Sequence, residues 1–529
     1  MKIKISLLFL ICALFFSSCS SVYDDDFQSI KVMFSLSSLT GRSVRTTAGV
    51  DKEFSIEVFV KNSKGEVLEK FTPEERYSSD SNIVVGFSQL PKNAMIQVTA
   101  KLTEYEVSAN GAHEICKYMG NSNWVKLQKQ VHEVLLSLNK LINVNFYVDD
   151  EVFRSYEIVS GKTLPVPPVP SKDNKLFDFW AINGSTDPFN WATQIYENLD
   201  LYAIWDELIF SGNISIDGTE FEKTSFSKVI PVGSTRTIVG SDAEFLASTT
   251  IYSKGLFYKG RTVVISRPYA MCQYEVTQEL YKSVMGENPS TCDAESTGYP
   301  TADGEEPKYK PVETVSWCDA IVFCNKLSVE CGLDPCYYID NNGNQDYNTE
   351  NWGNILTDES LSLGICCDFD KNGYRLPTEE EWEFAARGGN PDSEEWDYAY
   401  SGAQTSLYGT LKPTESIMDS GMDTVGWYKY NLGGETSETP LTKSQKGYST
   451  HEVGKKQPNS LKLYDMSGNV AEWCWDIADF GSGNGTGHVR RGGFWLKEPG
   501  YAIVTYRAAS GPLIKGKEFG FRLCRTITN

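Results

Sequence analysis

Residues 463–476 read Leu463-Tyr-Asp-Met-Ser-Gly-Asn-Val-Ala-Glu-Trp-Cys-Trp-Asp476, and the C-terminal half of the chain is organised around them. A short polar turn, Asp465 to Asn469, interrupts apolar and aromatic residues there. Gly468 lets the backbone approach closely, so Asp465 and Glu472 would supply hard oxygen ligands to a calcium-like cation from one tight turn. A Gly-Asn turn between two core segments explains the same residues without a metal. The residues alone leave both interpretations open.

Six further motifs occupy the same half of the chain. They are, in chain order, Tyr274-Glu-Val-Thr-Gln-Glu-Leu-Tyr281, Met285-Gly-Glu-Asn-Pro-Ser290, Pro311-Val-Glu-Thr-Val-Ser-Trp317, Gly373-Tyr-Arg-Leu-Pro-Thr-Glu-Glu-Glu-Trp-Glu-Phe-Ala-Ala-Arg-Gly-Gly389, Arg490-Arg-Gly-Gly-Phe-Trp-Leu496 and Gly520-Phe-Arg-Leu-Cys-Arg525. With these motifs in this order, the chain from about Phe226 to Arg525 resembles the formylglycine-generating enzyme family, also called the sulfatase-modifying factor domain. The resemblance predicts one domain at residues 226–529.

The resemblance implies both a fold and a metal site. Family members adopt an irregular α+β fold related to C-type lectins, with long loops. In the family, the motif at residues 463–476 binds calcium, and the matching ligands here are the side chain of Asp465, the carbonyls of Gly468 and Val470, and the side chain of Glu472. Asp465 stands where some catalytic members have Asn, a change that keeps the oxygen and adds charge. The family's other calcium motif has no match among residues 400–450.

The resemblance also identifies what is missing. Enzymatic members oxidise a sulfatase cysteine to formylglycine with oxygen and with copper held by two cysteines, which lie four and nine residues after the second glycine of the Arg-Gly-Gly motif. Counted from Gly493, these positions are Lys497 and Ala502, and Tyr501 matches the tyrosine before the second cysteine. Neither an ammonium nor a methyl group replaces a thiolate as a ligand of Cu(I). We therefore predict no copper site and no catalytic residue.

Composition excludes several other classes of function. A chain of 529 residues with 40% hydrophobic residues is long enough for about three or four domains with real cores. Its net charge of −21 argues against a nucleic-acid partner, because phosphate contacts are made chiefly by clustered Lys and Arg. Only four histidines are present, and their scatter along the chain argues against a zinc or non-haem iron site: they are His113, His132, His451 and His488.

The N-terminus has the pattern of an export signal. Lys2 and Lys4 form a charged start, an apolar run follows, and two small residues precede Cys19. The pattern predicts a lipoprotein signal at residues 1–19 with Cys19 as the acceptor of a diacylglyceryl group, and a polar tether at residues 20–29. A plain secretory signal with an incidental cysteine is the alternative. We expect a protein of the bacterial cell envelope, held at the membrane by its lipid anchor.

Eleven of the 13 cysteines remain once Cys12 leaves with the signal and Cys19 is acylated. An odd number in an exported protein permits disulfides but leaves at least one thiol unpaired. Most of these cysteines are interpreted as small core residues or disulfide halves. Cys474 and Cys524 are the candidates for a substitute copper pair, although each belongs to a different motif.

Two smaller units precede the large domain. Period-two alternation, as in residues 54–60 and 96–102, predicts a small antiparallel β-sandwich at residues 30–139. Residues 140–205 resemble the bacterial surface repeat first described in internalins (the Listeria-Bacteroides repeat), a compact β-grasp-like module of exported proteins. Its expected strands include residues 142–148, 177–180 and 199–205. The polar stretch at residues 206–225 is predicted to be a linker.

Helix signals are clearest in the large domain. Residues 277–284 and 316–330 are expected to be helical, the second with a Ser316 N-cap and a buried face made of Ala320, Phe323, Cys324 and Leu327. Thr378 and Glu381 have the spacing of a capping box. The acidic residues that follow, Glu379, Glu380, Glu381 and Glu383, suit a helix N-terminus, and acid/base catalysis is the alternative interpretation.

Three functions remain open. The first is a binding or structural role for a domain that has lost the oxidase, with a protein or glycan partner and with aromatic surface offered by Trp427, Tyr428, Phe494 and Trp495, although core packing explains these rings as well. The second is a formylglycine-generating oxidase acting on sulfatase cysteines, or an iron-dependent oxidation. The third is a component of a cell-surface assembly, which only analogy between family members supports.

Overall fold

The computed structural model describes residues 27–35, 51–78, 82–91, 94–108, 111–127, 131–135, 139–247, 250, 252–412, 416–479 and 486–528. The predicted signal with Cys19 therefore lies outside the described residues, as does most of the tether. The protein is multidomain and mostly β, with few helices. Its contacts divide it into two compact units, one of residues 1–166 and 182–202 and the other of residues 167–181 and 203–529. None of the described helices is long and apolar enough to cross a bilayer.

The N-terminal unit begins with two groups of strands around one core. One sheet has the order β5 (Asn82–Pro91), β1 (Phe27–Ser35) and β9 (Val131–Leu135). The second contains β7 (Gly111–Asn121), β6 (Met95–Ser108), β2 (Asp51–Asn62) and β3 (Val67–Phe71), with the short strands β4 (Tyr77–Ser78) and β8 (Val125–Lys126) at its edges. Along β2, Phe54, Ile56, Val58 and Val60 are buried, and their neighbours are not. This alternation is the one that the sequence predicted for residues 54–60.

Two features of this unit differ from the predicted antiparallel sandwich at residues 30–139. Strand β9 pairs with β1 in parallel, so the first sheet is mixed. The predicted boundary between residues 139 and 140 is also not a break in the hydrogen-bonding pattern, because β10 (Asn139–Val148) pairs with β7 through Asn139, Lys140 and Leu141. Both features result from pairing between strands that are distant in the sequence. The alternation of residues within one strand does not reveal which strand it pairs with.

The strands expected in the repeat-like segment at residues 140–205 are present. Strand β10 pairs antiparallel with β11 (Glu151–Val159) and parallel with the start of β13 (Leu199–Glu207). The remaining strand is β12 (Lys175–Ile182). Phe146 is fully buried on β10, with its ring edge-on to Tyr156 at 5.7 Å and stacked on Trp191 at 6.4 Å. Aromatic packing of this kind stabilises a small module that has little other core.

The linker predicted at residues 206–225 is wrong. This segment forms β14 (Ile209–Ser211), β15 (Ile214–Ile216) and β16 (Thr219–Phe221). Strand β14 joins the main sheet of the large domain through β17 (Phe226–Ile230). Ile214 and Phe221 are buried in the same apolar cluster as Phe226. The segment is polar overall because these three-residue strands bury few side chains, so its composition resembles that of a connection.

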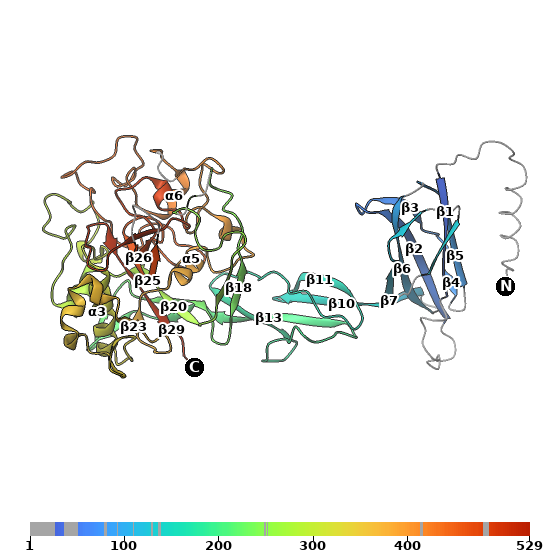
Figure 1. Cartoon of the computed structure of the whole chain (residues 1–529), viewed down its shortest axis with the longest axis horizontal. Helices are drawn as coiled ribbons and strands as arrows, with labels where there is room; N and C mark the ends of the chain where they lie inside the picture. Colours follow the sequence, from blue (N-terminus) through green and yellow to red (C-terminus); the bar gives the residue numbers. More distant parts are fainter. Residues whose placement is uncertain are drawn as a thin grey trace, which may run out of the picture. The chain divides into compact units, whose positions relative to one another are not determined.

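The large domain is built on two sheets. One has the order β14, β17, β20 (Tyr269–Glu275), β29 (Arg522–Thr526) and β24 (Tyr374–Arg375). The other has the order β27 (Ala508–Ser510), β26 (Thr486–Arg491), β25 (Ala471–Asp479) and β28 (Phe519–Gly520). Short pairs complete it: β18 (Arg236–Val239) with β19 (Thr262–Ile265), and β21 (Tyr337–Asn341) with β22 (Asn344–Asp346) and β23 (Ile365–Cys367). Long irregular connections join these strands, as Figure 1 shows.

The α-helices described in the large domain are α2 (Gln278–Met285), α3 (Trp317–Glu330), α4 (Glu359–Ser362), α5 (Glu379–Ala386) and α6 (Ser420–Val425). Three of these five, α2, α3 and α5, begin where the sequence predicted, and α4 and α6 were not predicted. Thr277 caps α2, and Ser316 and Thr378 each complete a capping box, with Asp319 and Glu381 respectively. The four residues predicted to face the core from α3 are fully buried. Single turns of 3-10 helix occur at Pro307–Tyr309, Thr349–Asn351, Gly353–Leu356, Glu394–Asp397 and Pro499–Tyr501.

Candidate functional site

The turn that carries the predicted calcium ligands is held in a defined conformation. Gly468 has φ 96°, and a Cβ atom at this position would lie 2.3 Å from the backbone oxygen of Trp427. Asn469, which also has positive φ, donates its backbone N–H to the same oxygen at 2.9 Å. The Asn469 amide then donates to Glu275 Oε2 at 2.7 Å and to the His451 carbonyl at 3.2 Å. Side-chain bonds therefore fix the turn to residues far away in the chain.

Three buried carboxylates lie beside this turn, and one buried guanidinium forms an ion pair with one of them. Glu275, Asp465 and Glu472 are each at most 1% exposed. Arg522, also fully buried, pairs with Glu472 through an Nη2–Oε1 contact of 2.7 Å. Burial, followed by the charges of Asp465 and Glu472, raises the pKa of Glu275 well above its usual range. Burial also raises the pKa of Asp465 to about 6. Burial and the neighbouring carboxylates therefore both favour the protonated forms of Glu275 and Asp465.

The four predicted calcium ligands are not equivalent in this geometry. Asp465 Oδ2 accepts from the Gly454 N–H at 2.7 Å, while its Oδ1 is buried without a hydrogen-bond partner. That oxygen fits a cation ligand. Glu472 does not fit as placed, because Arg522 donates to both of its oxygens and the Trp382 indole donates to Oε2 at 2.7 Å. Across the described part of the chain, no three His, Cys, Asp or Glu side chains are grouped so that they could hold a metal ion.

The acidic start of α5 serves ion pairing, and the acid/base interpretation finds no support in the geometry. Glu381 pairs with Arg375 at 2.7 Å, and Glu383 pairs with Arg387 at 3.1 Å and with Arg491 at 2.6 Å. The other two carboxylates are also paired, Glu379 with Arg491 and Arg507, and Glu380 with Arg261. The helix dipole accounts for part of this placement, but neighbouring arginines engage every one of the four side chains.

Strand β26 sends two neighbouring arginines in opposite directions, as a strand must. Arg491 is fully buried and contacts α5, where it pairs with Glu379 and Glu383 and donates to the Val504 carbonyl at 2.7 Å. Arg490, one residue earlier, lines a pocket on the other face. In Figure 1, β25 and β26 lie beside α5 in the large domain. One face of β26 therefore carries a buried, ion-paired arginine, and the other face carries an arginine that lines a pocket.

That pocket lies where the family resemblance places the copper cysteines. It has a volume of about 210 Å³, and Lys497 and Tyr501 contribute to its wall. Gly493, with φ 69°, brings the chain close to Tyr501, since a Cβ atom there would lie 2.5 Å from the Tyr501 backbone oxygen. Ala502 is 2% exposed and packs in the main apolar core. The pocket lining is Ala471, Arg490, Gly493, Phe494, Lys497, Tyr501, Tyr506 and Ala508.

Thiols do not reach this pocket from the described residues. Cys474 and Cys524 are fully buried in the apolar core, and burial raises the pKa of both well above that of a free thiol. A protonated, inaccessible thiol is a poor metal ligand. The cysteines of the large domain are free rather than disulfide-bonded: Cys272, Cys292, Cys318, Cys324, Cys331, Cys336, Cys366, Cys367, Cys474 and Cys524. The absence of copper stays a prediction.

The aromatic residues expected at the surface are mostly buried. Tyr428 and Trp495 are fully buried, and Trp427 is 6% exposed and stacks on His451 at 3.8 Å. Only Phe494 keeps partial exposure, at the pocket described above. The prediction of an aromatic surface at these positions is therefore wrong for three of the four. Their packing positions the loops around the turn at Gly468.

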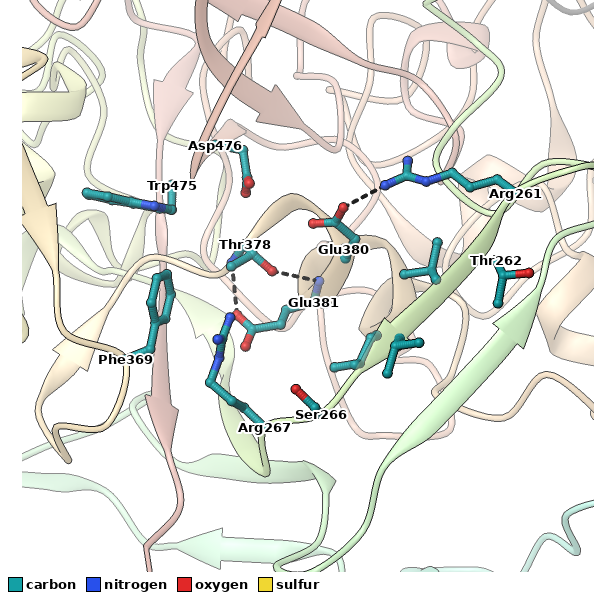
Figure 2. A pocket seen from close by; sticks show the side chains of 13 residues that line it. Arg261, Thr262, Ser266, Arg267, Phe369, Thr378, Glu380, Glu381, Trp475 and Asp476 are labelled. Carbon is teal, nitrogen blue, oxygen red and sulfur yellow. Dashed lines mark hydrogen bonds and ion pairs between the residues drawn. The ribbon is translucent and has the colours of Figure 1, made fainter.

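A larger pocket of about 430 Å³ lies between β19 and the start of α5. Figure 2 shows Trp475 and Phe369 on one side of it, Arg261 paired with Glu380 on the other, and Thr378 and Glu381 between them. Asp476 accepts the Glu379 N–H at 2.6 Å, and burial, with the nearby glutamates, raises the pKa of Asp476 to about 7. Arg261 pairs with Glu380, whereas Arg267 lies over the Phe369 ring at 4.2 Å, so the lining of this pocket carries two cations and three carboxylates. The lining of the pocket at Lys497 carries two cations and no carboxylate.

Comparison with known proteins identifies the family of the large domain. The sulfatase-modifying factor enzyme 1-like domain matches residues 228–527. This chain belongs to that family. The match confirms the resemblance that the ordered motifs indicated, and its bounds lie within two residues of those predicted from the sequence.

Named relatives within the family differ in how much they share. The chaperone protein LppX of Paenibacillus barcinonensis is 32% identical over 298 residues, which are 55% of this chain and 91% of that protein. The formylglycine-generating enzyme of Streptomyces coelicolor is 29% identical over 165 residues, 28% of this chain and 46% of the enzyme. Among solved structures, Treponema denticola variable protein 1 is 34% identical, with a TM-score of 0.41, and the match covers 57% of this chain and 99% of that one.

Several residues of the site were not predicted from the sequence. Arg490 and Tyr506 line the pocket at Lys497, and Glu275 and Arg522 surround the turn at Asp465. Arg490 is the first residue of a motif that was recognised, so its position was available as a signal. No local signal indicated the role of Glu275, because this role depends on contact with Asn469, which lies 194 residues further along the chain.

Proposed function

We propose that this protein is a lipid-anchored binding protein of the bacterial cell envelope, and that its sulfatase-modifying factor domain binds a partner without oxidising it. The observation that carries the proposal is the pocket at the family's cysteine positions. Lys497 stands there, Ala502 is buried behind it, and no lining residue among those described is a thiol. Copper-dependent oxidation requires a soft thiolate pair at this place.

Export and anchoring rest on the N-terminal sequence. Lys2 and Lys4, the apolar run and Cys19 after two serines have the arrangement of a lipoprotein signal. The repeat-like module at residues 140–205, similar to that of internalins, belongs to exported proteins as well. Labelling cells with a radioactive or alkyne-bearing fatty acid tests the anchor. The wild-type chain should incorporate label and Cys19→Ser should not.

The partner is a protein or a glycan, or the neighbours of this protein in a surface assembly. A relative that this chain matches over 91% of its length carries the name chaperone, and this favours a protein partner. The −21 net charge does not suit nucleic acid. Calcium belongs to the proposal only as a structural ion near Asp465, whose Oδ1 is buried without a partner.

Oxygen uptake provides the direct test of the binding role. The purified protein, supplied with copper and with a cysteine peptide of the sulfatase type, should consume no oxygen above the rate of buffer with copper. The formylglycine-generating oxidase is the competing function. A turnover rate that Cys474→Ser or Cys524→Ser abolishes would establish it and overturn the proposal. The matched control is Cys292→Ser, a buried cysteine in a different cluster.

A further inference from the structure

The pocket at Lys497 combines cations with rings and has no acidic lining residue. Its polar side chains are the guanidinium of Arg490, the ammonium of Lys497 and the hydroxyls of two tyrosines, Tyr501 and Tyr506. Phe494 adds a third ring. A concave site with aromatic walls and a few converging polar groups is the usual form of a small-ligand site. The sign of the charge then indicates which ligands it accepts.

Arg490 has unused hydrogen-bonding capacity at this site. The residue is 9% exposed, and its guanidinium lies 3.7 Å from the centre of the Phe519 ring. Nη2 donates to Ser510 Oγ at 2.7 Å and to the Ala509 carbonyl at 3.4 Å, whereas Nε is buried without a partner. An unsatisfied buried donor costs about 1–3 kcal/mol, more when charged, so such groups generally have a ligand or water. Burial also lowers the pKa of Arg490, to about 10.

Lys497 supplies the second cation, and its ammonium group is available to a ligand. Its Nζ lies 4.8 Å from the centre of the Tyr501 ring and 5.9 Å from that of Phe494, which holds the ammonium over the aromatic wall. The adjacent Glu498 is engaged elsewhere, because it pairs with Lys429 at 2.9 Å. Among the described residues, no carboxylate forms an ion pair with either of the two positive groups of the pocket.

We propose that this pocket binds a carboxylate carried by an aromatic or large apolar group, a ligand class that rests on the proposed binding function. One carboxylate oxygen accepts from the Arg490 guanidinium and the other from the Lys497 ammonium. The attached apolar group contacts Phe494, Tyr501 and Tyr506. Charge-assisted bonds of this kind are about twice as strong as neutral ones. Two sources carry this chemistry: a free aromatic acid, and a polypeptide that ends in an aromatic residue.

Calorimetric titration of the purified full chain tests the assignment with N-acetylphenylalanine and with N-acetylphenylalaninamide, which differ only in the carboxylate. We expect the acid to bind at least about tenfold more tightly than the amide. A short peptide ending in phenylalanine separates the two sources, because it binds more tightly than the acid if the partner is a polypeptide end and more weakly if the partner is a free acid. Equal binding of acid and amide, or binding of neither at millimolar concentration, overturns the proposal.

Lys497→Met should weaken binding of the acid about tenfold and leave the weak binding of the amide unchanged. The matched control is Lys254→Met, since Lys254 also lies over a tyrosine, at 3.5 Å from the Tyr258 ring, but outside the pocket. Equal losses in both variants contradict the site. Arg490→Lys keeps the positive charge but lacks the Nε donor. It provides a second test of the site if Lys497→Met does not fold. Oxygen uptake measured on the same preparation reports separately on the proposed function.

Discussion

Arg522 and Glu472 form a fully buried ion pair that joins the last motif of the domain to the turn at its centre. The Nη2–Oε1 distance is 2.7 Å, and Nε also donates to the carboxylate at 3.1 and 3.2 Å. Arg522 additionally donates to the carbonyls of Cys272 and Tyr464. One side chain therefore connects β29 and β20, which are neighbours in one sheet, to β25 in the other sheet. The charge of Glu472 stabilises the fold here, whether or not a metal binds nearby.

Glu472→Gln should lower the free energy of unfolding by about 3–5 kcal/mol, the usual cost of removing one partner of a buried ion pair. The glutamine amide would face the Arg522 donors, and the guanidinium would keep its charge without a counter-ion. Urea unfolding followed by tryptophan fluorescence measures the change. Asp303→Asn, which breaks an exposed pair with Lys446, should cost no more than about 1 kcal/mol and is the control. Similar losses in both variants would show that burial of the pair is unimportant.

Calcium should act through Asp465 and not through Glu472. If the ion binds at the unpartnered Oδ1, the melting temperature of the wild-type chain rises in calcium relative to chelator, because a ligand that binds only the folded state stabilises it. Asp465→Ala, which removes the oxygen, should lose this response. Glu472→Gln should lower the melting temperature in both conditions and keep a response to calcium. A wild-type melting temperature that is the same in calcium and in chelator removes calcium from the proposal.

Stability should also depend on pH through Asp476. Burial raises its pKa from 3.8 to about 7, so between these values the folded chain holds a proton that the unfolded chain has released. Its contribution is favourable at acid pH and is lost as pH rises through about 7. Asp476→Asn should therefore raise stability by about 2 kcal/mol at pH 8 and by much less at pH 4. Thermal melts across this range measure the difference, and a gain that is the same at both pH values contradicts the assignment.

Local signals explain which elements were predictable. The capping boxes at Ser316 and Thr378 place two helix starts because both partners of each box lie within four residues. Alternating burial from Phe54 to Val60 follows from the two-residue period of a strand. In the same way, ordered motifs were enough to recognise the family. These features need no knowledge of what the segment packs against.

Features that depend on distant contacts were not predictable. Glu472 looked like a free calcium ligand, because its commitment to Arg522 joins residues 50 apart in sequence. The strands at residues 209–221 looked like a linker, because each buries at most one or two side chains. Trp495 was open to both interpretations, aromatic surface and core packing, and it is fully buried in a cluster with Cys292 and Leu432. In each case the role of the residue or segment depends on tertiary contacts that its local sequence does not reveal.

Gly493 should be the most sensitive position near the carboxylate pocket. It combines φ 69° with a backbone oxygen, that of Tyr501, 2.5 Å from where a Cβ atom would lie. Gly493→Ala must therefore move the segment that holds Lys497 and Tyr501, and we expect a loss of about 2–4 kcal/mol in stability together with weaker binding of N-acetylphenylalanine. Gly434→Ala is the matched control, since Gly434 also has positive φ, 91°, but nothing lies within 4 Å of its Cβ position. The control carries only the conformational cost of about 1 kcal/mol. Equal losses in the two variants would mean that the close approach at Tyr501 contributes nothing.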